Sequence, residues 1–381
     1  MKLSTICLAA VLLLLAGPSF SQDDPHVAKV LRVLSNTPLI DGHNDLPWAI
    51  RESVTSPHDV HAPEHNLRQR TAFHTDIPRL QEGMIGGQFW SVYIPYSPVN
   101  SGAAQAQLEQ IDIANQIIAR YPDVFAAAYT ASDVNRIFGE GRIASMLGIE
   151  GGHAIENSLG VLRAYYAMGV RYMTLTHNGT LDWADAANGD QVHGGLTEFG
   201  NEVVREMNRL GMMVDLSHTS VGTMSDALDV SVAPVIWSHA DTKALNDVGR
   251  NVPDEILRRL PDNGGVVMIT FVGSFLTSND EATIVDVANH IEHVVEVAGI
   301  DHVGIGSDYD GTDSLPVGME DVSTYPKLFL ELSIRGWSEN DMAKLAGENI
   351  LRAMSETEVV ARRLQRERGP SMATIEELDG N

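Results

Sequence analysis

Seven residues that could bind metal ions or move protons follow short apolar runs in this sequence of 381 residues. They are His43, Asp45, Glu150, His177, His218, His239 and Asp308. Imidazole and carboxylate groups are the usual oxygen and nitrogen ligands of zinc, and three of them suffice for a catalytic ion. A carboxylate also has two oxygens, with which it can bridge two metals. The set therefore predicts a hydrolytic centre with ligands enough for two ions.

The local spacing of these residues supports the same interpretation. His43 and Asp45 are two positions apart, so on an extended strand both side chains point to the same side. Glu150 precedes two glycines, which let the backbone approach a ligand closely. A single histidine at the end of a strand is usually structural, so the prediction rests on the whole set. No Gly-x-Ser-x-Gly motif is present to favour a serine nucleophile instead.

The elements that must position these residues are short apolar runs separated by amphipathic stretches. The runs are 38–41, 88–94, 143–149, 171–176, 212–216, 234–237, 266–270 and 302–305. Helical spacing is clearest at 105–120, 197–210 and 282–297. Eight alternating units predict an α/β fold, a (β/α)8 TIM-type barrel with insertions, in which all carboxyl ends of the strands open onto one face.

An open, doubly wound sheet is the rival fold. Its dinucleotide fingerprint is missing, because Tyr309 stands where the third glycine after Gly304 and Gly306 should be. No linker or repeat divides the chain, so we expect one barrel domain over residues 22–381. Residues 1–21 are expected to be a signal peptide.

The signal peptide is predicted from Lys2 and the apolar run 6–16, which is shorter than the roughly 20 residues that span a bilayer. Small residues at 19 and 21 predict a mature start near Gln22. The only cysteine, Cys7, lies upstream, so the mature chain is expected to have no disulfide. Residues 362–381 lack the hydrophobic tail of a glycolipid anchor. We therefore expect an exported protein, secreted or periplasmic, that is soluble after processing.

Composition narrows the classes of partner. The chain has 26 Lys and Arg against 51 Asp and Glu, a formal net charge of −25. Proteins that bind nucleic acid or anionic membranes need a basic face, so both are disfavoured as partners. Hydrophobic residues make up 44% and charged residues 20%, as in an ordinary globular enzyme.

Six stretches, in order along the chain, resemble the successive motifs of the membrane (renal-type) dipeptidases. They are DGHNDLPW at 41–48, GIEGGH at 148–153, LTHN at 175–178, DLSH at 215–218, VIWSH at 235–239 and RNVPD at 250–254. The resemblance extends from Pro38 to beyond Asp310, nearly the whole mature domain. These enzymes are binuclear zinc hydrolases on a barrel of the amidohydrolase superfamily, so the resemblance implies the fold expected above.

The resemblance also implies two zinc ions per chain. One would be held by His43, Asp45 and Glu150, and Glu150 would bridge to a second held by His218 and His239. A hydroxide between the ions would attack the peptide carbon.

Three further roles are implied by the same family motifs. His177 would face the scissile carbonyl and its developing oxyanion, and Arg250 would take the terminal carboxylate of the substrate. Asp308 would handle the proton of the attacking water. The glycolipid anchor and the intersubunit cysteine of the mammalian members are absent from this sequence. Membrane attachment and a disulfide-linked dimer are therefore not implied, which leaves a non-covalent homodimer open.

Three functions remain to be weighed. The first is a zinc dipeptidase that acts on short, free-ended dipeptides. The alternative is a related binuclear zinc amidohydrolase that acts on an N-acyl amino acid or a β-lactam. The third, a catalytically inactive binding protein on the same barrel, is disfavoured because competent residues occupy all five ligand positions and position 308.

Overall fold

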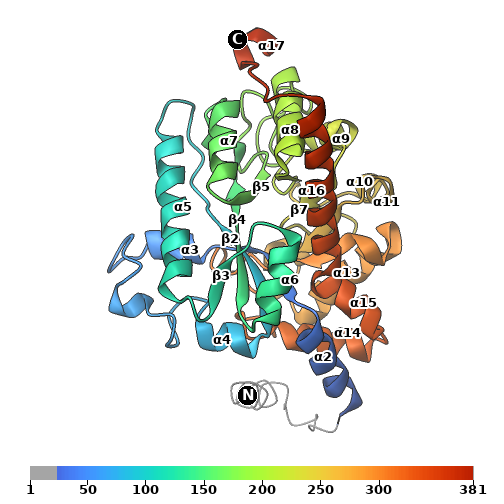
Figure 1. The fold of residues 1–381 in the computed structure, drawn as a ribbon. Coiled ribbons are helices and arrows are strands. Elements are labelled where there is room, and N and C mark those ends of the chain that lie inside the picture. Colours follow the sequence, from blue (N-terminus) through green and yellow to red (C-terminus); the bar gives the residue numbers. More distant parts are fainter. Residues whose placement is uncertain (1–23, 381) are drawn as a thin grey trace.

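A computed structural model describes residues 24–380 of the chain, and nine strands alternate there with helices (Figure 1). The strands are β1 (Leu39–Asn44), β2 (Ile85–Ser91), β3 (Phe125–Ala127), β4 (Ile143–Glu150), β5 (Val170–Thr174), β6 (Met213–Asp215), β7 (Val235–Trp237), β8 (Val266–Ile269) and β9 (Val303–Ile305). Each of the eight predicted apolar runs overlaps one of them. The ninth, β3, was not predicted, because its three residues include no β-branched side chain.

The pairing of β2 with β4 closes the sheet into a barrel. Hydrogen-bonded neighbours follow the order β2-β1-β9-β8-β7-β6-β5-β4, and all pairs are parallel. The closing register extends from Gly87↔Ala144 to Ser91↔Gly148. An open doubly wound sheet would leave two free edges, so this closure excludes it. β3 pairs with the start of β4, beside the eight-stranded barrel. The predicted (β/α)8 fold is confirmed.

Helices lie outside the strands (Figure 1). The α-helices are α2 (Pro25–Asn36), α3 (Leu46–Arg51), α4 (Ile77–Glu82), α5 (Ala103–Arg120), α6 (Ala131–Gly139), α7 (Leu159–Ala167), α8 (Glu198–Leu210), α9 (Val221–Val230), α10 (Asp254–Leu257), α11 (Leu260–Asn263), α12 (Gly273–Leu276), α13 (Ile284–Ala298), α14 (Tyr325–Ile334), α15 (Glu339–Ala343), α16 (Asn349–Glu367) and α17 (Ile375–Asp379). Short 3-10 turns cover η1 (Pro63–His65), η2 (Gly152–Ile155) and η3 (Ile300–His302), and a π-helical turn, η4 (Lys344–Glu348), precedes α16. The three stretches with helical spacing correspond to α5, α8 and α13.

The sequence of α8 shows why these helices form and pack. The Thr197 side chain accepts a hydrogen bond from a backbone N–H of the first turn, and Gly211 ends the helix with a φ of 89°. Phe199, Val203 and Met207 recur every fourth residue and are fully buried. An amphipathic helix with both ends capped in this way is stabilised chiefly by burial of its apolar face.

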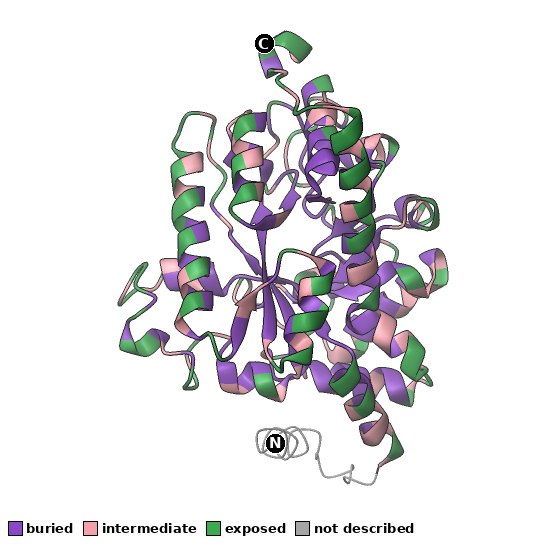
Figure 2. Ribbon diagram, viewed as in Figure 1, coloured by how far each residue is buried: buried purple, intermediate pink, exposed green. Residues whose placement is uncertain are grey.

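Burial follows the layers of the barrel (Figure 2). Every residue of β1, β2 and β4 is buried, as expected of parallel strands covered by side chains on both faces. The helices are buried on the side toward the strands and exposed on the other (Figure 2). The strand ends are therefore held by packing on all sides, which makes them rigid supports for a site.

Two further findings concern the predicted signal peptide and membrane-spanning helices. The predicted signal peptide, residues 1–21, lies outside the described residues. Among residues 24–380, no helix is both long and apolar enough to cross a bilayer.

Candidate active site

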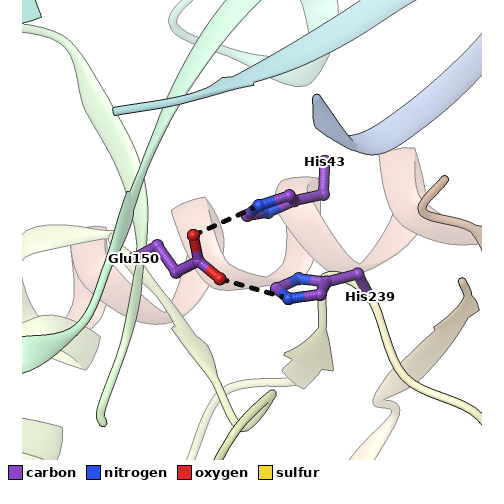
Figure 3. Close-up of side chains that lie close together, drawn as sticks. All are labelled: His43, Glu150 and His239. Atoms are coloured by element: carbon purple, nitrogen blue, oxygen red, sulfur yellow. Dashed lines mark ion pairs between the residues drawn. The ribbon is translucent and has the colours of Figure 1, made fainter. Parts of the chain in front are cut away.

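Glu150 lies at the centre of the predicted set, at the last position of β4. Its Oε2 is 3.4 Å from His43 Nε2, while its Oε1 is 3.0 Å from His218 Nε2 and 3.3 Å from His239 Nε2. His177 Nε2 lies 3.7 Å from the same Oε1. Figure 3 shows one oxygen directed at His43 and the other at His239, whose rings lie one above the other on the same side of the carboxylate. One carboxylate thus has two separate groups of neighbours.

His43 also has two acidic neighbours, Asp45 and Asp308, where β1 and β9 end. His43 Nε2 lies 3.2 Å from Asp45 Oδ2 and 3.9 Å from Asp308 Oδ1. Backbone hydrogen bonds tie the two strand ends together, from Asp45 N–H to the Tyr309 carbonyl and from Asp308 N–H to the His43 carbonyl. Asp45 follows β1 rather than lying on it, yet its carboxylate still reaches His43. The structure therefore brings all seven predicted residues to one end of the barrel.

Three residues on two of these loops have unusual backbone conformations. His218, Asp308 and Asp310 have φ values of 63°, 65° and 65°, in the left-handed region that side chains other than glycine rarely adopt. Such conformations cost roughly 1–3 kcal/mol each and persist where the surrounding structure imposes them. All three residues line one cavity. The strain is therefore concentrated where side chains are aimed at a common point.

The donor atoms fit a bound cation. His43 Nε2 and Asp45 Oδ1 are buried and have no hydrogen-bond partner among the described residues. The Nε2 atoms of His218 and His239 lie only 3.0 Å apart and face the same oxygen of Glu150. Three groups of ligand atoms each lie within 4.8 Å of one another: His43, Glu150 and His239; Glu150, His177 and His218; and His43, Asp45 and Asp308. Buried polar atoms without partners are costly, and a metal ion would satisfy them.

The electrostatics favour the ligand forms of Glu150, His218 and His239. His43 differs, because burial would lower its pKa but Tyr172, Glu150 and Asp45 together raise that pKa well above its ordinary value. Burial alone would raise the pKa of Glu150, but His43 and His177 hold that pKa well below its ordinary value. Burial lowers the pKa of His239 to about 3, and it lowers the pKa of His218 well below its ordinary value. At neutral pH the carboxylate is therefore charged and these two imidazoles are neutral, which are the forms that bind metal ions.

The cluster opens into a cavity of about 640 Å³. Besides Asp45, Glu150, His177, His218 and Asp308, its wall includes Trp48, Tyr93, Asn178, Asn188, Phe275 and Asp310. Trp48 meets Tyr93 edge to face, and the Tyr93 ring lies 4.9 Å from the His177 ring. Burial raises the pKa of Tyr93 to about 12, so its phenol stays neutral. The cavity is large enough for a small molecule.

Tyr93 and the other additional wall residues were not predicted from the sequence. The only local signal for Tyr93 is its position two residues after the end of β2. Asn188 lies on a loop and Phe275 on the short helix α12, and the course of both segments depends on the whole barrel, so no spacing could have identified them.

Arg250 occupies a different place from the other predicted residues. It is 1% exposed, and it is not among the residues that line the cavity. Its Nη2 donates to the His239 carbonyl at 2.9 Å, and its guanidinium lies 5.6 Å from the centre of the Phe275 ring. Its Nε and Nη1 have no hydrogen-bond partner among the described residues. Arg250 is therefore a buried cation with free donors next to the wall of the cavity.

Comparison with known proteins agrees with this geometry. The model of the membrane dipeptidase family, peptidase family M19, matches residues 27–368. The chain belongs to this family. The matched segment includes every predicted site residue from His43 to Asp308. The family is one of metallopeptidases, so this dipeptidase-family protein is a metal-dependent hydrolase.

Solved structures support both the fold and the family. The metallopeptidase called dipeptidase AC is 27% identical, with a TM-score of 0.74 over 84% of this chain and 99% of that one. A metallopeptidase from Rhodobacter sphaeroides, bound to a phosphinate mimic of L-Ala-D-Ala, is 26% identical, with the same TM-score and coverage. The probable dipeptidase PvdM from Pseudomonas aeruginosa is 22% identical and shares the fold, with a TM-score of 0.80 over 89% of this chain and all of that one.

Proposed function

We propose that this protein is a zinc-dependent dipeptidase that hydrolyses the peptide bond of short, free-ended dipeptides. The observation that carries the proposal is Glu150, which lines the cavity and whose Oε2 faces His43 while its Oε1 faces His218 and His239. Membership of the family supports the reaction class. The dipeptide mimic bound to the Rhodobacter sphaeroides protein supports a substrate of that size and chemistry.

The proposed ligands divide into two sets that share one residue. His43, Asp45 and Glu150 would hold one zinc ion, and Glu150, His218 and His239 would hold the other. Each set has the three nitrogen and oxygen ligands of a catalytic zinc site, which keeps a position open for water or substrate. When bound, two zinc ions supply Lewis acidity and an activated water at neutral pH.

The remaining polar residues would orient the substrate and move protons. His177 faces the cavity and can donate a hydrogen bond to a developing oxyanion. Asp308 also faces the cavity and can carry a proton to the departing amine. Arg250, whose Nε and Nη1 have no partner among the described residues, would bind the terminal carboxylate.

The reaction and substrate class can be tested with one panel of compounds. Zinc-loaded protein of measured metal content would be assayed on free dipeptides, on their N-acylated and C-amidated versions, and on a β-lactam. A dipeptidase should turn over the free dipeptides and lose most of its activity when either terminus is blocked. Faster turnover of an N-acyl amino acid or of the β-lactam would replace the dipeptidase proposal with another amidohydrolase activity.

The bridge itself can be tested with Glu150→Ala. Because Glu150 belongs to both ligand sets, its removal should reduce the affinity for both ions and abolish activity. Elemental analysis of the purified variant measures the outcome. Two zinc ions per chain together with normal turnover would show that Glu150 does not bridge.

A further inference from the structure

Two of the proposed zinc ligands have a hydroxyl group behind the imidazole ring. His43 Nδ1 lies 3.0 Å from the Tyr172 hydroxyl, and His239 Nδ1 lies 2.9 Å from the Ser238 hydroxyl. We propose that Tyr172 and Ser238 are positioning residues that fix the tautomer of His43 and His239, so that Nε2 of each ring is the free ligand atom. The inference rests on the proposed zinc ligands, and it concerns the hydrogen bonds that set their tautomers.

The Tyr172 hydroxyl contacts both His43 Nδ1 and the Gly42 carbonyl. A phenol has one proton to donate, and that of Tyr172 is directed at the Gly42 carbonyl, 3.1 Å away. Toward His43 the phenol oxygen can then only accept. In the proposed arrangement Nδ1 of His43 carries the ring proton, which leaves the lone pair on Nε2. That nitrogen is the one that faces Asp45 and Glu150.

The barrel interior is shaped to admit the Tyr172 ring. Tyr172 lies on β5 and is fully buried. Its neighbour on β4 is Gly148, which pairs with it across the sheet. A Cβ added to Gly148 would lie 1.9 Å from Tyr172 Cζ, so only glycine leaves space for the ring at this place. The phenol therefore reaches His43 because β4 lacks a side chain there.

The Ser238 hydroxyl also has a single proton, and its acceptor is the Asp215 carboxylate instead of a backbone carbonyl. The Ser238 hydroxyl donates to Asp215 Oδ2 at 2.6 Å, and the Ser217 hydroxyl lies farther away, at 3.4 Å. The Ser238 oxygen is then an acceptor for His239 Nδ1–H. As a result, His239 also directs its Nε2 lone pair at Glu150.

Asp215 is held firmly as the acceptor of that hydroxyl proton. Its Oδ1 accepts the backbone N–H groups of Ser217 and Ser238, and its Oδ2 also accepts the Thr174 hydroxyl. The carboxylate is fully buried at the end of β6. Four donors around one buried carboxylate leave it no freedom to turn, so the Ser238 proton stays directed away from His239.

His218 provides an internal contrast. Its Nδ1 is buried and has no hydrogen-bond partner among the described residues. The proposed hydrogen bonds therefore orient His43 and His239 and not every histidine of the centre. Metal ligands oriented by a hydrogen bond on the other ring nitrogen typically lose 10- to 100-fold in metal affinity when that partner is removed.

Zinc affinity measured by competition with a chelator tests the inference. Tyr172→Phe and Ser238→Ala remove the acceptor oxygens but keep the rings and backbone. Each variant should bind one of its two zinc ions about 10- to 100-fold more weakly. Tyr165→Phe and Ser231→Ala remove buried hydroxyls that bond to the Ala154 and Ala233 carbonyls instead, and they should keep the affinity of the wild-type protein. Unchanged affinity in Tyr172→Phe and Ser238→Ala would overturn the inference.

A spectroscopic measurement on the unaltered protein gives a second readout. In zinc-loaded protein with 15N-labelled histidine, His43 and His239 should each show a slowly exchanging proton on Nδ1 and a metal-shifted Nε2. Zinc bound through Nδ1 of either ring would overturn the inference even if a variant failed to fold. Glu150→Ala separates the two proposals. If Glu150→Ala still binds two zinc ions, the assignment of the zinc ligands is wrong. If instead Tyr172→Phe and Ser238→Ala bind zinc with wild-type affinity and keep the wild-type histidine tautomers, only the positioning role of Tyr172 and Ser238 is wrong.

Discussion

Asp308 combines a buried position with a cluster of other acids. Burial raises the pKa of its carboxyl well above the ordinary value, and the neighbouring Asp45 and Glu150 add to the rise, while His43 opposes it. A carboxyl with a raised pKa holds a proton more readily, which suits transfer to a leaving amine. Its left-handed backbone aims the side chain at the cavity.

We therefore predict that Asp308→Asn retains the shape of the site but loses the proton carrier. The value of kcat should fall by roughly 10²–10⁴ while zinc content stays at the level of the unaltered protein. Steady-state kinetics and elemental analysis of the same sample measure both. Asp280→Asn, which changes an exposed carboxylate that does not line the cavity, is the control and should have nearly normal kcat. Loss of zinc together with activity would make Asp308 a ligand instead.

The position of Arg250 leads to a prediction about how the carboxyl terminus of the substrate is bound. Its buried Nε and Nη1 lack hydrogen-bond partners among the described residues, and a substrate carboxylate would supply an acceptor. Arg250→Met should therefore reduce kcat/KM for a free dipeptide by about 2–5 kcal/mol, the cost of losing one partner of a buried charge pair. Kinetics on matched free and C-amidated dipeptides measure the effect. The amidated compound, which lacks the carboxylate, should lose little, and equal losses on both would contradict this role.

At the scale of elements, the contact between β4 and β5 connects stability with the site. Gly148→Ala would place a methyl group within 2.3 Å of three atoms of the Tyr172 ring. Overpacking of a core typically costs about 1–3 kcal/mol, and here the displaced side chain is the one that contacts His43. We predict a lower free energy of unfolding together with weaker zinc binding.

Denaturant unfolding and chelator competition measure the two effects of Gly148→Ala. The matched control is Gly160→Ala in α7, where an added Cβ meets its nearest atom at 3.5 Å. That change should be neutral or stabilising, since alanine has a higher helix propensity than glycine. Stability and zinc affinity that both remain normal in Gly148→Ala would show that the ring can move without consequence.

At the scale of the whole molecule, the residues that precede the barrel lead to a prediction about where the protein is located. We propose that the protein is exported and cleaved after Ser21, which follows from the apolar run at 6–16 and the small residues after it. Intact mass spectrometry of protein recovered from the periplasm or medium should show a chain that starts near Gln22. A full-length mass with Met1 retained in active protein would contradict export by this route.

The barrel and the convergence of its seven polar residues could both be predicted from local patterns. Apolar runs that alternate with amphipathic stretches indicate parallel strands joined by helices, and parallel strands in a closed barrel have all their carboxyl ends on one face. Any residue directly after a strand must therefore approach the others. His43, Glu150 and His239 come together for this reason, although they are far apart in the chain.

Other features depend on distances that no sequence pattern encodes. The burial of Arg250 behind Phe275, the aromatic wall of Trp48 and Tyr93, and the extra strand β3 follow from how loops and strands pack in three dimensions. The contact of Tyr172 with His43 requires the register of β4 against β5, because a shift of one residue would turn the ring to the other face of the sheet. Sequence information was thus enough to identify the strand ends and their chemistry. The tertiary structure decided which nitrogen and oxygen atoms face one another, because hydrogen bonds and metal sites depend on separations of a few tenths of an ångström.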